Sequence, residues 1–326
     1  YAGVSTLVGE LSERDKPPSA AMLARVAEYL GQDRVTALVQ ASPDTLSHDL
    51  IQELLDHHGT GRVLLRNCRD NIEGFPERRL TTYPLSLPDQ YLTLPATDNV
   101  ANLLTPERNF DDGWLAFDPR AEWLAQWFKT HRHDKSLVIC ADADTAQALE
   151  AWLRLRRGIR SAVFHEGMDL LQRDRAAAYF ADPEEDAEAL ISSEIGSEGR
   201  NFQFARHLVL FDLPMNPDLL EQRIGRLDRI GQQHTVDIHV PYFENSASAA
   251  LVQWFHQGIN AFERVCPAGA SLYAQFGAQL SAQMHQPDNA AALAELLQRT
   301  ATNRVELMEI LQQGRDRLLE LNSFTR

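Results

Sequence analysis

Arginines at positions 223, 226 and 229 are spaced in a way that suits a phosphate group. Arg226 and Arg229 are three residues apart, so on a helix they would lie on one face. Two planar guanidinium groups bind a polyphosphate better than a single carboxylate, because each offers several fixed N–H donors. Asn216 and the proline after it mark a helix start, which predicts a helix over 217–227. A solvated basic helix face is the alternative, and the stretch alone does not separate the two.

A second stretch, residues 191–202, joins an apolar run to a polar segment that contains glycine. Gly196 and Gly199 would let backbone N–H groups approach a phosphate closely, with Ser193 and Asn201 beside them. Taken alone, the same pattern is typical of an ordinary strand-to-helix turn. It is not a Walker A loop, because no Lys-Ser/Thr follows the second glycine. The 326 residues contain no Walker A sequence and no magnesium-binding Asp-Glu-x-His motif.

Short apolar strands that alternate with helices must position these residues. The predicted strands are 136–141, 161–164, 187–193, 207–213 and 236–240, and the predicted helices between them are 119–129, 144–156, 170–180 and 217–227. This alternation indicates a parallel sheet with helices on both faces. Ligands of such sheets bind beyond the carboxyl ends of the strands. The loops that matter most are therefore those after Ala141, Phe164, Ser193 and Leu213.

Helical patterns flank this region on both sides. Residues 1–58 carry apolar side chains at helical spacing, beginning around Met22, and an extended piece is expected at 62–66. Residues 71–118 lose regular pattern and are rich in proline and glycine, which is typical of a connection between domains. Three further helices are predicted at 247–262, 271–284 and 290–321.

The composition is that of a globular chain with a strongly acidic balance. Apolar residues make up 44% and charged residues 24%, and 326 residues allow about two domains. The net charge of −15 repels nucleic acid, so contact with it needs a local basic patch. No apolar run of about 18 residues and no signal peptide is visible, so no membrane contact is expected. Because Tyr1 is not a methionine, a fragment of a longer protein is expected.

Cysteine and histidine spacing predicts no metal site. Cys68, Cys140 and Cys266 lie far apart and form no Cys-x-x-Cys pair, so reduced thiols in a cytoplasmic protein are expected. His165 has no second histidine four residues on and is not expected to bind a metal. The strongest local basic cluster, interpreted as the solvated end of a helix, consists of Arg154, Arg156, Arg157 and Arg160.

Together, the two phosphate-type stretches resemble motifs V and VI of superfamily-two helicases. The ending Arg229-Ile230-Gly231-Gln232 is similar to the Swi/Snf-type version of motif VI. More narrowly, the chain resembles the bacterial RNA polymerase-associated ATPases of the Swi/Snf type. That resemblance is carried by Asp118-Pro119-Arg120 and by residues 58–64, 163–168, 193–201 and 314–320, and it is weakest in 1–45 and 85–112.

The resemblance implies a two-lobed motor that binds ATP and magnesium between RecA-like lobes. The first lobe of such a motor carries the Walker motifs and the catalytic base. The expected fold class is α/β: a RecA-like parallel sheet with helices on both faces, a helical N-terminal segment and a helical C-terminal extension. Residues 1–70 would be the helical end of the first lobe, 71–118 the inter-lobe connection, 119–243 the second lobe and 244–326 the helical extension.

The resemblance also implies roles for individual residues. Arg229 would be the arginine finger on the γ-phosphate, and Arg226 would assist it. Gln222 and Gly199 would face the ATP. The residues that would face nucleic acid are Ser193, Gly196, Asn201, His165 and Gly167.

Four nearby positions carry further implications. Glu198 and Arg200 stand where Swi/Snf relatives usually carry apolar residues, which leaves the contacts there open. Arg223 occupies a variable position of the motif and is interpreted as solvated packing. Asp228 is interpreted as holding neighbouring arginines in place rather than taking part in catalysis.

The implied activity is ATP hydrolysis coupled to translocation on DNA or RNA, without sequence preference. The resemblance further implies a cytoplasmic, nucleoid-associated bacterial protein that binds RNA polymerase and promotes its recycling. This chain alone is predicted to hydrolyse no ATP, because it lacks the Walker motifs. Two alternatives stay open: a Swi/Snf-type remodeller or helicase that acts on another nucleic-acid complex, and a non-catalytic docking scaffold. The pair Arg226 and Arg229 argues against the scaffold.

Overall fold

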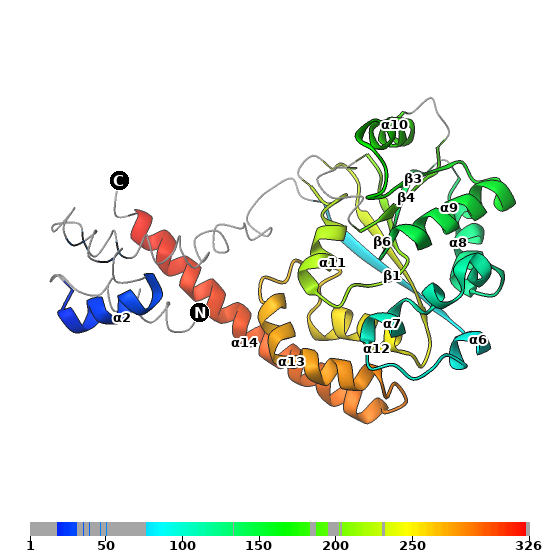
Figure 1. Cartoon of the computed structure of the whole chain (residues 1–326). Helices are drawn as coiled ribbons and strands as arrows, with labels where there is room; N and C mark the ends of the chain where they lie inside the picture. The colour runs from blue at the N-terminus through cyan, green and yellow to red at the C-terminus, as the bar shows by residue number, and fades with distance from the viewer. Residues whose placement is uncertain are drawn as a thin grey trace. The chain divides into compact units, whose positions relative to one another are not determined.

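The computed structural model describes most of the chain from residue 76 onward and parts of the N-terminal region. The described residues are 18–30, 35, 39, 46, 50, 76–132, 134–182, 187–194, 202, 204–229 and 232–323, the last helix as backbone alone after residue 312. Contacts divide the chain into two compact units (Figure 1). One consists of residues 1–72 and 308–326, and the other of residues 73–307.

The second unit is built on a six-stranded sheet whose order is β1-β6-β5-β2-β4-β3. Every neighbouring pair in it is parallel. The strands are β1 (Arg78–Leu85), β2 (Ser136–Cys140), β3 (Ser161–Phe164), β4 (Ala189–Ser193), β5 (His207–Leu210) and β6 (Val236–Phe243). The parallel α/β sheet predicted from the alternating pattern is confirmed.

The edge strand β1 corrects the interpretation of residues 71–118 as a connection. It pairs with β6 over its whole length, from Arg78 opposite Val236 to Leu85 opposite Phe243. Its sequence, RRLTTYPL, is largely polar and contains a proline, so it lacks the apolar run that marked the other strands. An edge strand tolerates both features, because only one of its sides needs a hydrogen-bonded neighbour.

Helices cover both faces of the sheet (Figure 1). α8 (Pro119–Thr130) and α9 (Ala143–Arg157) pack on one face, and α10 (Leu170–Ala181) and α11 (Pro217–Ile224) lie on the other. Side chains alternate along a strand, and one set of them meets α8 and α9 in a single buried core. That core includes Val138, Cys140, Ile191, Val209 and Phe211 of the strand region with Leu124, Trp127, Phe128, Leu149 and Leu153 of the helices.

Capping residues set where these helices begin and end. Asp118 caps α8 by accepting a hydrogen bond from the Arg120 amide, and Asp142 caps α9 in the same way. Asp169 and Gln172 form a reciprocal capping box at the start of α10. Gly158 ends α9 with φ +68°, a left-handed conformation that glycine adopts without strain.

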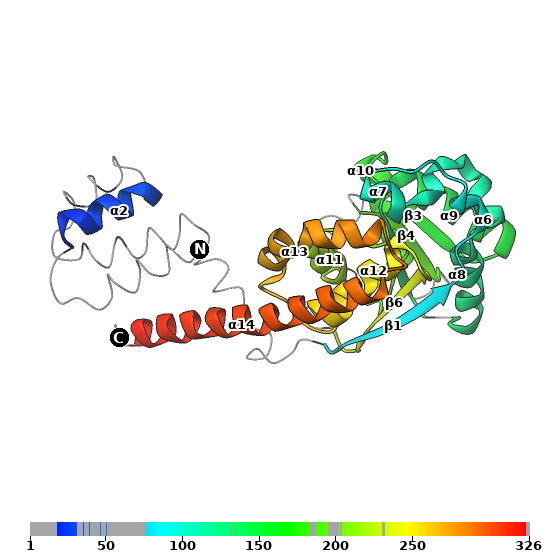
Figure 2. The same cartoon turned by 90° about the horizontal axis from the view of Figure 1, so that it is seen from below.

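Short helices precede α8, and longer ones follow the sheet. The helices before α8 are α6 (Asp89–Leu92), α7 (Val100–Leu104), η2 (Pro106–Asn109) and η3 (Asp111–Ala116). The helices after the sheet are α12 (Ala247–Gln253), the π-helical η4 (Trp254–Gly258), α13 (Gly269–Met284) and α14 (Ala290–Ser323). Within the second unit α13 and α14 lie side by side (Figure 2), and Arg299 donates to Gln279 across them at 3.3 Å. None of the described helices is both long and apolar enough to cross a membrane.

The first unit contains α2 (Ala20–Leu30), where the predicted helical spacing is confirmed. Its apolar side chains form a small core with other helical residues of the unit: Met22, Val26, Leu30, Val35, Leu46 and Leu50. The extended piece expected at 62–66 lies outside the described residues.

Candidate nucleotide and nucleic-acid site

The arginine stretch begins in α11 but does not continue as a helix. α11 ends at Ile224, and Gly225 is its C-cap. A tight turn follows, in which the Leu227 amide donates to the Ile224 carbonyl at 3.1 Å. The predicted helix over 217–227 is therefore three residues too long. Arg226 and Arg229 consequently do not share a helix face, and that premise of the sequence analysis is wrong.

Arg229 and Arg226 differ in exposure. Arg229 is exposed, and its Nε donates to the Gly225 carbonyl at 3.0 Å. Arg226 is only 8% exposed, and its backbone carbonyl accepts from the Phe202 amide at 3.0 Å. Gln222, at the end of α11, is exposed. A phosphate group can therefore reach Arg229 and Gln222 directly in this conformation, whereas Arg226 is covered.

Arg223 is the most buried arginine of the stretch, at 2% exposure. Its Nη1 donates to Oδ1 of Asp212 at 3.0 Å, and its Nη2 donates to Oε2 of Glu194 at 3.0 Å. Burial raises the pKa of Asp212, and the Arg223 guanidinium partly offsets that rise. The interpretation of Arg223 as solvated packing is wrong, because two carboxylates hold it inside the protein.

Asp228 does hold an arginine, but one that is distant in the sequence. Oδ2 of Asp228 accepts a very short hydrogen bond from Nε of Arg78, the first residue of β1. The same guanidinium makes two bonds to Glu221 of α11, at 2.8 and 2.6 Å. The helix and the turn after it are thus fixed to the edge strand by one buried arginine.

The ends of β3 and β4 bring three of the predicted nucleic-acid-facing residues together. Ser193 is buried, and its Oγ donates to Oε2 of Glu166 at 2.6 Å, which lowers the pKa of Glu166. Nδ1 of His165 accepts from the Gly167 amide at 3.2 Å. A Cβ at position 167 would lie 3.1 Å from the His165 ring, so glycine permits this tight turn. The predicted residues Gly196, Gly199 and Asn201, with Glu198 and Arg200, lie outside the described residues.

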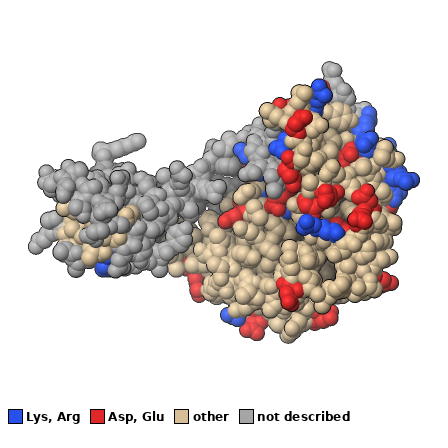
Figure 3. Space-filling view, viewed as in Figure 1, with Lys and Arg blue, Asp and Glu red and all other residues tan. Residues whose placement is uncertain are grey.

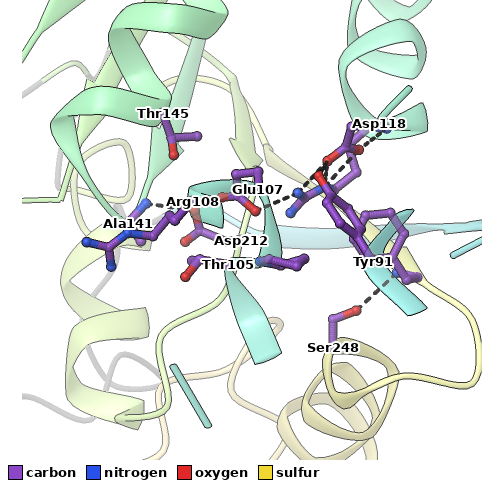
Figure 4. Close-up of polar contacts among 12 residues, drawn as sticks. Tyr91, Thr105, Glu107, Arg108, Asp118, Ala141, Thr145, Asp212 and Ser248 are labelled. Atoms are coloured by element: carbon purple, nitrogen blue, oxygen red, sulfur yellow. Dashed lines mark hydrogen bonds and ion pairs between the residues drawn. The ribbon is translucent and has the colours of Figure 1, made fainter. Parts of the chain in front are cut away.

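A buried network occupies the carboxyl ends of the other strands (Figure 4). Nη2 of Arg120 lies 2.6 Å from Oδ2 of Asp118 and 2.8 Å from Oε2 of Glu107. The Tyr91 hydroxyl donates to the same Asp118 oxygen at 2.7 Å. Burial raises the pKa of Glu107 to about 7 despite the nearby arginine. Oδ2 of Asp212, beside Glu107 in Figure 4, accepts from the amide at the end of β2 at 2.7 Å.

Residues 89–117 therefore close part of the sheet edge at which ligands were expected. Nε of Arg108 lies 3.2 Å from Oδ2 of Asp142 after β2, and the Trp114 ring lies 5.8 Å from that of Phe211 after β5. The loops after Ala141 and Leu213 are engaged by this packing. The candidate ligand surface is thereby narrowed to the ends of β3 and β4 and to α11 with its turn.

Sequence reasoning missed the partners of Arg223 and the partners of Arg120. A signal was present for Asp212, since it is an acidic residue directly after an apolar strand, at a sheet edge where polar side chains gather. Glu107 gave no such signal, because it lies in a stretch without periodicity.

The basic cluster at the end of α9 is partly neutralised. Nε of Arg154 donates to Glu150 at 2.9 Å, and Arg157 pairs with Glu122 while lying 4.5 Å from the Trp152 ring centre. In Figure 3 the basic side chains gather along the edge of the second unit near α9, and acidic ones form a band across the same face. Among the described residues, no three His, Cys, Asp or Glu side chains are arranged to hold a metal ion.

Two family models match the chain. The helicase conserved C-terminal domain matches residues 119–231, and the RNA polymerase recycling family C-terminal model matches residues 235–326. The RNA polymerase-associated protein RapA of Pseudomonas aeruginosa (strain LESB58) is 52% identical over 334 residues, which cover 99% of this chain. RapA of Pseudomonas savastanoi pv. phaseolicola (strain 1448A / Race 6) is 50% identical over 331 residues, with the same coverage.

Over 99% of its length the chain is similar to RapA proteins, and it matches both family models. It spans 35% of the length of these RapA relatives. The helicase C-terminal match covers the segment that forms α8 to α11, and it agrees with the RecA-like sheet expected for this region.

Two solved structures align with most of this chain at TM-scores below 0.5. The C-terminal part of the Fun30 ATPase domain aligns with a TM-score of 0.40 and 16% identity, over 88% of this chain and 93% of that one. The Sulfolobus solfataricus SWI2/SNF2 ATPase core in complex with dsDNA aligns with a TM-score of 0.39 and 14% identity, over 87% of this chain and 46% of that one.

Proposed function

We propose that this chain supplies the second ATPase lobe of an ATP-dependent nucleic-acid translocase that binds RNA polymerase and promotes its recycling in transcription. The observation that carries the proposal is the exposed guanidinium of Arg229, which lies two residues before the end of the segment matched by the helicase C-terminal model. The names of the RapA relatives and of the C-terminal family model support RNA polymerase as the partner.

Arg229 acts as the arginine finger on the γ-phosphate of ATP bound by the first lobe. Negative charge spreads over the γ-phosphoryl oxygens in the transition state, and an arginine supplied from a separate element is worth about 10³–10⁵ in rate in GTPases. Gln222 and Gly199 face the same phosphates. Arg226 assists once it is uncovered, because in the present conformation its side chain is buried.

The donors in this chain fit the phosphate end of a nucleotide and not its metal ion. Exposed Arg229 and Gln222 offer N–H donors to phosphate oxygens, whereas the described residues hold no carboxylate cluster arranged for a metal ion. Magnesium and the Walker contacts therefore belong to the first lobe. On its own, this chain is expected to hydrolyse no ATP, and DNA-stimulated turnover by the purified chain would contradict that expectation.

The nucleic-acid surface is formed by His165 and Gly167 at the end of β3, together with Gly196 and Asn201. Contacts of this kind position a backbone without reading bases, so binding to DNA, or to RNA, is independent of sequence. Ser193, predicted to face nucleic acid, is buried in this conformation and instead holds Glu166 of the same turn. The protein works in the bacterial cytoplasm at the nucleoid.

The test replaces Arg229 by alanine in a protein that carries this chain together with a first lobe. ATP turnover should fall by about 10³-fold while ATP binding is retained, because the finger acts on the transition state. Arg154→Ala is the matched control, since that arginine is also well exposed but lies at the end of α9. Full turnover in Arg229→Ala would refute the assignment. Failure of RNA polymerase to co-purify would favour a remodeller that acts on another nucleic-acid complex.

A further inference from the structure

Arg223 joins α11 to the carboxyl ends of two strands. After β5, its Nη1 donates to the backbone carbonyl and to Oδ1 of Asp212, at 2.7 and 3.0 Å. After β4, its Nε and Nη2 donate to the two carboxylate oxygens of Glu194, at 3.3 and 3.0 Å. Bidentate pairing of this kind fixes the orientation of both partners. α11 therefore cannot shift against these strand ends without breaking buried, charge-assisted hydrogen bonds.

The contact continues from Glu194 to the loop after β3. Glu194 directly follows Ser193, whose hydroxyl donates to the Glu166 carboxylate at 2.6 Å. Glu166 belongs to the tight turn at 165–167, which the His165 ring closes by accepting from the Gly167 amide. Two sets of hydrogen bonds, linked by the backbone between Ser193 and Glu194, thus run from α11, through the end of β4, to the turn after β3.

These hydrogen bonds end at the two surfaces that the proposed function gives to different ligands. α11 carries Gln222 and leads into the turn with Arg229, whereas residues 165–167 belong to the nucleic-acid surface and the buried Ser193 holds Glu166 of that turn. We propose that Arg223 and Glu194 are positioning residues that couple the two surfaces, so that nucleic acid bound at the ends of β3 and β4 orients α11 for ATP hydrolysis. This inference rests on the proposed function, because it assigns a link between the two sites of that function.

Glu194, rather than Arg223, is the position to change. Removing Arg223 would leave the buried Asp212 carboxylate without its cation, and the loss of one partner of a buried ion pair risks unfolding the protein. Glu194→Gln keeps the size of the side chain and leaves Arg223 paired with Asp212. Asp212 itself stays anchored by the Ala141 amide at 2.7 Å. Glu107→Gln is the matched control, because it makes the same change in a buried carboxylate at the same sheet edge whose partner is Arg120.

The first measurement is ATP turnover by the protein that carries both lobes, with and without a mixed-sequence DNA duplex. In Glu194→Gln, turnover without DNA and the affinity for DNA should stay unchanged, and the stimulation by DNA should fall at least about fivefold, the lower end of typical coupling between two sites. Stimulation equal to that of the unaltered protein, or an equal loss in Glu107→Gln, would overturn the coupling.

The second measurement follows amide hydrogen exchange and does not depend on catalysis. In the unaltered protein, the DNA duplex should slow exchange both in residues 187–194 and in α11. In Glu194→Gln it should still slow exchange in 187–194 but no longer in α11. Protection of α11 in both proteins, or in neither, refutes the coupling. A protein that hydrolyses no ATP would instead refute the proposed function, and the exchange experiment would still decide the link between the two surfaces.

Discussion

His239 lies in a buried pair of histidines, and its replacement tests how burial controls the stability of the sheet against acid. Its Nε2 lies 3.1 Å from Nδ1 of His207, and its Nδ1 lies 2.9 Å from the Tyr83 hydroxyl. Burial lowers the pKa of His239 from 6.5 to about 3. The folded protein therefore keeps this ring neutral at a pH at which the unfolded chain has already bound a proton.

The sign and size of the effect follow from that difference. Because the unfolded chain binds more protons between pH 3 and 6.5, the stability that His239 contributes falls as the pH falls through this window. At about pH 5 the unfolded imidazole is roughly 30 times more often protonated than neutral, while the folded ring is still neutral. The contribution of His239 to the free energy of unfolding is therefore lower at pH 5 than at pH 8 by RT ln 33, or about 2 kcal/mol.

Glu107 acts in the opposite direction, so the test must isolate His239. Burial raises the pKa of Glu107 from 4.5 to about 7, which means that the folded state binds the extra proton in that range and gains stability as the pH falls. The effect of Glu107 cancels when the unaltered chain is compared with His239→Gln at each pH. Glutamine can keep the hydrogen bond to His207 but does not titrate.

The assay is urea unfolding of both proteins at about pH 8 and pH 5, followed by circular dichroism. The unaltered chain should lose about 2 kcal/mol more than His239→Gln between the two conditions. His234→Gln, at an exposed ring, controls for the substitution itself. If the unaltered chain and His239→Gln differ in free energy of unfolding by the same amount at both values of pH, the assigned neutral state of the buried His239 is refuted.

Two further substitutions test other parts of the fold. Arg120→Met should lower the free energy of unfolding by about 3–5 kcal/mol, because it leaves Asp118 and Glu107 buried without their cation. The control Arg154→Met, at a side chain that is 52% exposed, should lower it by less than about 1 kcal/mol. Equal losses of the two variants in urea unfolding would contradict this. Gly158→Ala should lower the free energy of unfolding by about 1–2 kcal/mol. The loss comes from the backbone, since φ is +68° while nothing lies within 4 Å of the added Cβ. An unchanged urea midpoint of unfolding would contradict this and show that the helix end adapts.

The sheet could be predicted because five of its strands leave clear apolar or alternating patterns. Leu137 to Cys140 and Leu190 to Ser192 are buried on both faces, so their runs stand out from the helices around them. β1 could not be found in this way. Among the described strands it pairs only with β6, so selection for apolar residues is weak on its other edge, and its place in the sheet depends on Val236 to Phe243 far along the chain.

The candidate site was predictable in its residue types but not in its geometry. The arginines after α11 stood out by spacing, yet the helix ends at Ile224, before both Arg226 and Arg229, and sequence periodicity alone extended it too far. The partners of Arg223 were out of reach for a different reason. The ion pair Arg223–Glu194 joins α11 to the end of β4, which meet only when the sheet has formed, and residue spacing carries no information about such contacts.

The pairing of β1 with β6 has a consequence for how the chain folds during synthesis. Arg79 and its partner Asp237 are 158 residues apart. At about 5–20 residues per second, the ribosome needs roughly 8–30 s to produce the second strand after the first. During that time the edge strand has no neighbour, and Arg78 and Arg79 at its start disfavour pairing with the wrong chain, as charges on edge strands generally do. When β6 emerges, the same two arginines find their acidic partners Asp228 and Asp237, so the charges that protect the waiting strand also help to fix its final register.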